Sequence, residues 1–492
     1  MLSTPSPARR LRHYLSRANA SDSLQSSLSM QILITTLAEY QTEFWRPFGL
    51  ALRRAGHEPS FLSFDDRSTE MLKSSGLRTF SATGRPADLD VSDATLSATL
   101  ARFGIDNLNY WFGHERFAFG LTDGTELRRK LVWSLQTADR ALDELLRTGP
   151  VTMVQELGGF LSVIGSYFAA RRHGVDNWFV EPSFFRGRLF FLLNSFAAID
   201  VPDRFEGPVP PEVTRYLDDT VRQGAIVVPV KDRHQYTTAW KKIVNVRNAK
   251  RLLQKLVDKH IHGKTQEFGY IGGHVRTHAR MLFSSLRLKR QYTPLESCGP
   301  MVYYPLHVPG DMALTLRTPH LLDQLALIDY LCRSVPHTHR IVIKEHPAMV
   351  GAIDARRVVD LLQRHDNLRL LPPATNNYAV LRRADAVVSI NSKSGAEAAL
   401  LGKPVLVLGD AFYRRSSLVT QVNRIQDLPA AISAALLPSE PVPAEQVLRY
   451  FAGVWQNCLP GELYVASDAN VETFTRSLLE GLGRGATKGN HS

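Results

Sequence analysis

Two polar clusters in the last third of the chain carry side chains suited to binding phosphate. The first, Lys344–Pro347 (KEHP), follows the apolar run Ile341–Ile343, and the second, Asn391–Ser394 (NSKS), follows the apolar run Ala386–Ser389. Ammonium, imidazole and hydroxyl groups, together with backbone amides at the start of a helix, are groups that hold phosphate in proteins. Ligands of open α/β sheets bind beyond the carboxyl ends of the strands. We therefore expect both clusters to face one crevice.

Each cluster also has a structural interpretation. Lys344 and His346 can bind a phosphate, or His346 is an ordinary loop histidine before a proline that fixes the backbone. Ser392 and Ser394 are each able to cap a helix that begins near residue 395, and Glu397 follows Ser394 at the spacing of a capping box. In the functional interpretation, Asn391 and these hydroxyls line the phosphate site and Glu397 binds a ribose hydroxyl. The two clusters together favour this interpretation more than either does alone.

Several other kinds of site are not indicated. The sequence has no GxGxxG, no GxxxxGK[ST] and no GxSxG elbow. Its three cysteines are far apart and have no histidine at zinc-ligand spacing, which is typical of a protein from a reducing cytoplasm. We therefore expect no resident metal and no nicotinamide or P-loop phosphate site.

Carboxylates at strand ends in the first half are candidate general bases. Glu156 follows the strand-like run Val151–Gln155, and Glu181 follows Asn177–Val180. A base must reach the hydroxyl whose proton it takes, so it should lie on the opposite wall of a ligand crevice. Glu181 ranks first, Glu156 second, and Glu39, just after the first expected strand, third.

The elements expected to position these residues alternate between strand and helix. This pattern predicts an α/β protein with two Rossmann-like, doubly wound domains. The expected divisions are a disordered tail over 1–28, an N-terminal α/β domain over 29–230, a basic helical connection over 231–295, a C-terminal α/β domain over 296–440 and a C-terminal helical extension over 441–492.

Positive charge is concentrated in the expected connection. Residues 231–290 hold 15 Lys and Arg against 3 Asp and Glu, which accounts for the formal net charge of +12 of the whole chain. Such a segment indicates either an anionic partner, such as a membrane surface, or a solvated helical face. Basic residues without interleaved aromatics argue against nucleic acid. No apolar run is long enough to span a bilayer, and no secretory signal is expected at the N-terminus.

As a set, these motifs resemble the bacterial capsule polysaccharide biosynthesis/export family, which includes transferases that build a 3-deoxy-manno-octulosonic acid (Kdo) linker on lipid. The resemblance rests on EHP, on SINSKSGAEAALLGKPVLVLGDAFY and on YYPLHVPGD, over roughly residues 300–415. WFVEPSFFRGRL, which contains Glu181, is similar more loosely. The chain departs from the family pattern at His307, where a glutamine is expected.

The resemblance implies a GT-B-like fold, with an acceptor-side N-terminal domain and a C-terminal domain that binds a nucleotide sugar. It implies a cytoplasmic glycosyltransferase, peripheral at the inner membrane, that transfers Kdo or a similar acidic sugar from a CMP donor to a glycan or lipid-linked acceptor. Lys344, His346, Asn391, Ser392 and Ser394 would then surround the donor phosphate, with Glu397 on the ribose and no cofactor required. The alternatives are a polyol-phosphate transferase, a nucleotide-sugar epimerase and a non-catalytic capsule assembly or export protein.

Overall fold

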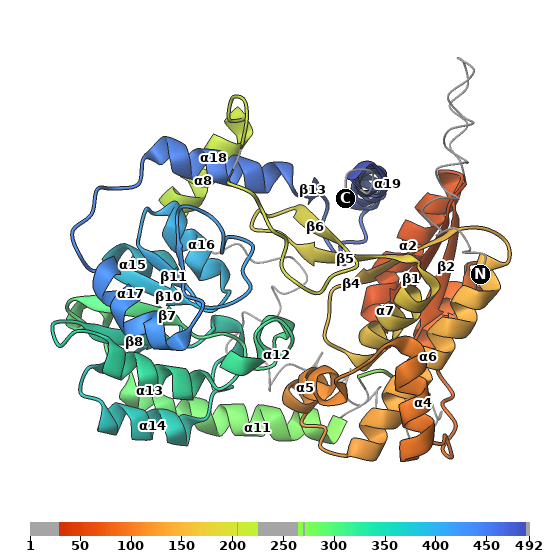
Figure 1. Cartoon of the computed structure of the whole chain (residues 1–492), viewed down its shortest axis with the longest axis horizontal. Coiled ribbons are helices and arrows are strands. Elements are labelled where there is room, and N and C mark those ends of the chain that lie inside the picture. Colours follow the sequence, from red (N-terminus) through yellow and green to blue (C-terminus); the bar gives the residue numbers. More distant parts are fainter. Residues whose placement is uncertain (1–28, 204, 225–263, 269–270, 489–492) are drawn as a thin grey trace, which may run out of the picture.

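The computed structural model describes residues 29–203, 205–224, 264–268 and 271–488, and these residues form two α/β domains (Figure 1). The predicted tail over 1–28 and most of the predicted basic connection, residues 231–263, lie outside the described residues. Each domain has its own central sheet, so the predicted fold class of two Rossmann-like domains is confirmed.

The N-terminal sheet has the strand order β13-β6-β5-β4-β1-β2-β3. Strands β1 to β5 are parallel, whereas β6 runs antiparallel to both of its neighbours. Residues of β1 are buried on both faces of the sheet because helices cover both faces. The strands are β1 (Gln31–Thr36), β2 (Glu58–Ser63), β3 (Arg78–Ser81), β4 (Val151–Glu156), β5 (Asp176–Pro182), β6 (Arg188–Leu193) and β13 (Leu459–Pro460).

Most helices of this domain begin at a side-chain cap or a proline, and four of the seven end at a glycine in the left-handed conformation. They are α2 (Glu39–Arg54), α3 (Asp66–Ser74), α4 (Asp93–Phe103), α5 (Leu108–Phe119), α6 (Gly124–Leu146), α7 (Leu161–His173) and α8 (Pro211–Gln223).

The C-terminal sheet is wholly parallel and has the strand order β12-β11-β10-β7-β8-β9. Counted from its first strand, this is the 3-2-1-4-5-6 order of a Rossmann fold, whose winding reverses between β7 and β10. The strands are β7 (Met301–Pro305), β8 (Arg340–Lys344), β9 (Leu368–Leu371), β10 (Ala386–Ser389), β11 (Val405–Val407) and β12 (Thr420–Gln421).

Helices cover both faces of this sheet, and α12 lies between the two domains against α5 (Figure 1). They are α11 (Ile271–Leu288), α12 (Met312–Thr315), α13 (Gln324–Ser334), α14 (Ala355–Arg364), α15 (Asn377–Arg383), α16 (Lys393–Leu400) and α17 (Leu428–Ala435). A 3-10 turn (Pro319–Leu321) precedes α13, and Asp323 caps α13 with its side chain.

The chain returns to the N-terminal domain at its end (Figure 1). Helix α18 (Ala444–Gln456) packs on α8, β13 extends the first sheet, and α19 (Asp468–Lys488) packs on α2. Arg188, at the start of β6, links the first sheet to the segment between α18 and β13. Its guanidinium lies 3.9 Å from the Trp455 ring centroid and donates to the Cys458 carbonyl at 2.6 Å. Among the described residues, no helix combines the length and apolar character needed to cross a membrane.

The carboxyl ends of the two sheets face each other across the domain interface. Lys393, at the start of α16, donates to the carbonyl of Ser183 at 2.6 Å, and Asp410, after β11, accepts from the amide of Ala198 at 2.7 Å. Ser183 follows β5 and Lys393 follows β10, so the first pair joins residues beyond the carboxyl ends of parallel strands in the two sheets. Ala198 follows the antiparallel strand β6, and its bond to Asp410 is a further contact between the domains. The loops expected to carry a ligand site therefore meet at this interface.

Candidate functional site

The point where the C-terminal sheet reverses its winding is flanked by His307 and Asn391. His307 lies two residues beyond the end of β7, and Asn391 lies two residues beyond the end of the adjacent strand β10. Neither His307 Nε2 nor Asn391 Oδ1 has a hydrogen-bond partner among the described residues, although both atoms are buried. Buried polar atoms are nearly always paired in folded proteins. These two atoms therefore mark a place where a polar ligand or water can bind.

The backbone around His307 and the amide of Asn391 are held firmly. Gln324 accepts from the His307 amide at 2.8 Å and donates to its carbonyl at 3.1 Å. Asn391 Nδ2 donates to the carbonyl of Ala313, on α12, at 2.7 Å. Burial lowers the pKa of His307 to about 4, with Asp311 opposing this shift and His346 adding to it. The imidazole is therefore neutral near pH 7.

His346 follows β8, the strand next to β7, and presents a hydrogen-bond donor. Its Nδ1 accepts from the amide of Ala348 at 3.3 Å and caps the 3-10 turn Pro347–Met349. A neutral imidazole that accepts at Nδ1 carries its proton on Nε2. An Nε2–H group is suited to a phosphate oxygen, as the sequence predicted for this residue.

Lys344 and Glu345 are buried more deeply than His346. Lys344 donates to the Thr375 carbonyl at 3.2 Å, and burial lowers its pKa to about 8 against the opposing effect of Glu397. Glu345 accepts from the Gly351 amide at 2.8 Å and from the Tyr292 hydroxyl at 3.3 Å. Both side chains support the loop after β8 from beneath.

The loop after β10 is fixed by Tyr413. The Tyr413 hydroxyl donates to the Ser392 carbonyl at 2.6 Å and lies 3.1 Å from Ser389 Oγ, which accepts from the Ser392 amide at 3.0 Å. A Cβ atom at Gly395 would lie 2.1 Å from the Tyr413 oxygen, so this position requires glycine. The loop and the first turn of α16 are thus rigidly placed.

The predicted capping box at Ser394 is not formed. Helix α16 begins at Lys393, and Ser392 is its cap, accepting from the Ser394 amide at 3.2 Å. Ser394 Oγ instead accepts from Asn377 at 3.1 Å. Because the helix starts earlier than predicted, Glu397 lies in its second turn and points into the core.

Glu397 is enclosed beneath the loop, with only 3% of its surface exposed. Its Oε2 accepts from Asn377 Nδ2 at 2.7 Å, and Asn377 Oδ1 accepts from the Tyr303 hydroxyl at 3.0 Å. Burial raises the pKa of Glu397 to about 7, although Asn377, Lys393 and Lys344 favour its ionised form. This enclosed position differs from the predicted contact with a ribose.

The candidate bases of the N-terminal domain are all engaged with other side chains. Both oxygens of Glu181 accept from Arg317 Nη2 at 3.1 Å, an ion pair between the domains in which the two side chains are 19% and 9% exposed. Glu156 accepts from Gln41 at 3.0 Å and from the hydroxyl of Tyr464. Glu39 lies 3.6 Å from the guanidinium of Arg67.

Helix α5 brings a residue to the interface that the sequence patterns did not indicate. His114 Nδ1 lies 2.9 Å from Thr315 Oγ1, whose hydroxyl donates to the Asp311 carbonyl at 3.2 Å. Nδ1 is therefore the donor, and Nε2 is a buried acceptor with no partner among the described residues. A Cβ at Gly159 would lie 2.4 Å from His114 Cγ, so this glycine makes room for the ring.

His114 and Arg317 carry no local sequence signal. His114 stands within an ordinary helical pattern, and Arg317 follows α12 without a motif around it. Their partners Thr315 and Glu181 are more than a hundred residues away in sequence. Only the docking of the two domains brings them together.

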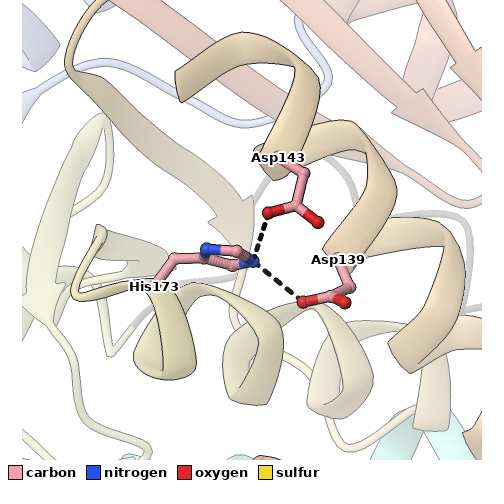
Figure 2. A group of neighbouring side chains, drawn as sticks. All are labelled: Asp139, Asp143 and His173. Atoms are coloured by element: carbon pink, nitrogen blue, oxygen red, sulfur yellow. Dashed lines mark hydrogen bonds and ion pairs between the residues drawn. The ribbon is translucent and has the colours of Figure 1, made fainter. Parts of the chain in front are cut away.

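A second cluster, on α6 and α7, has the composition of a metal site (Figure 2). Asp139, Asp143 and His173 offer ligand atoms within 4.8 Å of one another. However, Asp139 also accepts from Arg102 at 2.6 Å and from Arg172 at 2.5 Å. Two guanidiniums already compensate this carboxylate, so the cluster is better explained as an ion-pair network. It lies at the C-terminus of α7, toward the amino ends of the strands and away from the interface.

Comparison with known proteins identifies the family. A family model described as "Capsule polysaccharide biosynthesis protein" matches residues 165–432. Protein FixF of Sinorhizobium fredii is 32% identical over 173 residues, which make up 34% of this chain and 40% of that protein. The match thus spans less than half the length of this curated relative.

Solved structures show only distant likeness. The β-Kdo 2,7 transferase of Thermosulfurimonas dismutans KpsC is 15% identical, with a TM-score of 0.35 over 70% of this chain and 89% of that chain. CalG4, the calicheamicin glycosyltransferase, is 12% identical, with a TM-score of 0.28 over 92% and 99% of the two chains. These scores are too low for either structure to serve as a template for the site.

Proposed function

The chain belongs to the capsule polysaccharide biosynthesis protein family, as its sequence motifs indicated, and from this premise we propose that it is a glycosyltransferase of capsular or surface polysaccharide biosynthesis. The observation that carries the proposal is the convergence of His307, Asn391 and His346 beyond three adjacent parallel strands, β7, β10 and β8. This is where Rossmann-like domains bind nucleotides. The substrate would be a nucleotide sugar and the acceptor a glycan or lipid-linked glycan.

The donor we propose is a CMP-linked acidic sugar such as Kdo. The Nε2–H group of His346 would donate to the phosphate, and the side chains of Asn391, Ser392 and Ser394 would complete its surroundings. Burial keeps His307 neutral beside them, so its ring can either donate or accept. Groups fixed in advance stabilise the charge that develops on a leaving phosphate.

We also propose that the reaction uses no metal cofactor. A CMP leaving group carries one phosphate, whose charge these donors and the nearby cations can compensate. Transfer that is unchanged by a chelator would agree with this proposal, and loss of transfer restored by a divalent cation would contradict it.

The acceptor would approach from the N-terminal domain, where Glu181 and Glu156 remain the proposed bases. For Glu181 to take a proton, Arg317 would have to leave its carboxylate when the acceptor binds. For Glu156, Gln41 and Tyr464 would hold the carboxylate in place. Because nucleotide sugars are cytoplasmic metabolites, we place the reaction on the cytoplasmic side of the inner membrane.

The test is a transfer assay with CMP-, CDP- and UDP-linked donors and glycan acceptors, run on wild type, His346→Ala and His337→Ala. His337 is an exposed histidine just before β8, at the opposite end of that strand, and serves as the matched control. We expect transfer from a CMP-sugar that falls at least about a hundred-fold in His346→Ala only. CDP-glycerol turnover, epimerisation of a UDP-sugar, or transfer unaffected by His346→Ala would contradict the proposal.

A further inference from the structure

Helix α11 presents a stripe of arginines and large apolar side chains to solvent. Phe283 is 71% exposed and Leu286 is 58% exposed, and Arg276, Arg280 and Arg287 are exposed as well. We call these five residues the α11 stripe. Their spacing of three and four residues places them on one face of the helix.

The opposite face of α11 is anchored to the C-terminal domain. Met281 and Leu288 are 4% and 0% exposed, and the helix packs on α14. A Cβ at Gly351 would lie 2.0 Å from the carbonyl oxygen of Met281, so the two backbones are in close contact. The stripe therefore lies on the solvent-exposed face of a docked helix, and this helix runs along the lower edge of the molecule in Figure 1.

The charged side chains of α11 and of the turn that follows it have one sign. Residues 271–290 include five Lys and Arg and no Asp or Glu. Self-association through this face would bring like charges together, which is unfavourable. The partner should therefore be anionic.

The apolar members narrow the choice of anionic partner. A soluble polyanion would pair with the arginines but would leave Phe283 and Leu286 in water. A bilayer with anionic lipids satisfies both, because phosphates meet the guanidiniums while the apolar side chains enter the boundary between headgroups and acyl chains. We propose that the α11 stripe binds the surface of an anionic phospholipid bilayer. This inference does not depend on the proposed transferase activity.

The proposal is tested by flotation of the full chain with vesicles of phosphatidylcholine alone or mixed with phosphatidylglycerol. One variant is Phe283→Ser/Leu286→Ser, and its matched control is Ile425→Ser/Leu437→Ser, which changes two exposed apolar residues elsewhere. The second variant replaces the three stripe arginines by Gln, and its control replaces three exposed arginines on other helices: Arg54, Arg171 and Arg215. Circular dichroism checks that every variant is folded.

We expect wild type and both controls to bind only the anionic vesicles. An arginine close to an anionic surface contributes about five-fold to partitioning, so the arginine variant should bind at least about ten-fold more weakly. The apolar variant should also bind the anionic vesicles at least about ten-fold more weakly than wild type. This difference should persist at high salt, because salt screens the charges and not the apolar contacts. Stripe variants that bind like their controls, or wild type that ignores lipid charge, would overturn the proposal. So would an apolar variant that only converts an oligomer to a monomer.

Discussion

Replacing Glu397 by Gln should stabilise the fold at alkaline pH without impairing donor binding. The carboxyl is 3% exposed, and burial raises its pKa to about 7 from an ordinary value of 4.5. A carboxyl with a raised pKa in the folded state stabilises the fold fully below its unfolded pKa, and this contribution is lost as the pH rises through 7. The loss amounts to about 3 kcal/mol. Gln cannot ionise and keeps an oxygen that can accept from Asn377.

The assay is urea unfolding of wild type and Glu397→Gln at about pH 5 and about pH 8.5, since these values bracket the titration. We expect nearly equal stabilities at the lower pH and a variant more stable by about 3 kcal/mol at the higher pH. Glu296→Gln makes the same charge change at an exposed position and is the control. It should show no such gain.

The same variant separates a buried structural acid from a ribose ligand. If the carboxylate bound a ribose hydroxyl, its loss would cost about 1.5–3 kcal/mol and raise the donor KM roughly ten- to a hundred-fold. Because Glu397 is enclosed, we expect KM to stay within about two-fold of wild type. Glu397→Gln that is no more stable than wild type at alkaline pH, or a ten-fold rise in the donor KM, would refute this reasoning.

Three further predictions concern the domain interface and the loop after β10. Arg317→Met should lower the free energy of unfolding by about 2–3 kcal/mol because it leaves Glu181 unpaired, and the further change Glu181→Gln should restore part of that stability. A coupling energy near zero in the double-mutant cycle would contradict this prediction. Gly395→Ala should lower the free energy of unfolding by about 1–3 kcal/mol and weaken nucleotide binding, because its Cβ would clash with Tyr413. Gly483→Ala places its Cβ in open space and should not lower stability, so equal effects of the two changes would refute the clash. Burial lowers the pKa of His114 to about 4, so the stability it contributes above pH 6.5 is lost as the pH falls, by about 3 kcal/mol in total. His114→Asn should remove that part of the acid sensitivity, and an unchanged pH profile would contradict the assignment.

The α/β architecture could be predicted because its signals are local. The apolar runs of β1, β4, β7, β8 and β10 are bounded by turn residues, and each pattern is complete within a short window. β13 could not be predicted in this way, since two residues carry no period and their pairing with β6 depends on the return of the chain. The start of α16 was misplaced because either serine could cap it.

The placement of His346 and Asn391 at one edge of the C-terminal sheet could also be inferred from sequence, whereas the contacts across the domain interface could not. His346 and Asn391 stand two residues beyond the ends of β8 and β10, so topology alone brings them to one edge of the sheet. The importance of Glu181 was inferred from its strand end, but its partner Arg317 lies 136 residues away. Similarly, the burial of Glu397 follows from Asn377 and Tyr303, which come from two other elements. Contacts of this kind depend on tertiary packing, which the periodicity of the sequence does not predict.

Calorimetric titration with CMP and UDP tests the placement of the nucleotide site most directly, using wild type, His346→Ala and His337→Ala. We expect CMP to bind wild type and His337→Ala equally, and to bind His346→Ala at least about ten-fold more weakly because a charge-assisted bond to phosphate is lost. Absence of nucleotide binding to wild type, or equal binding to His346→Ala, would contradict a nucleotide site beyond β7, β8 and β10.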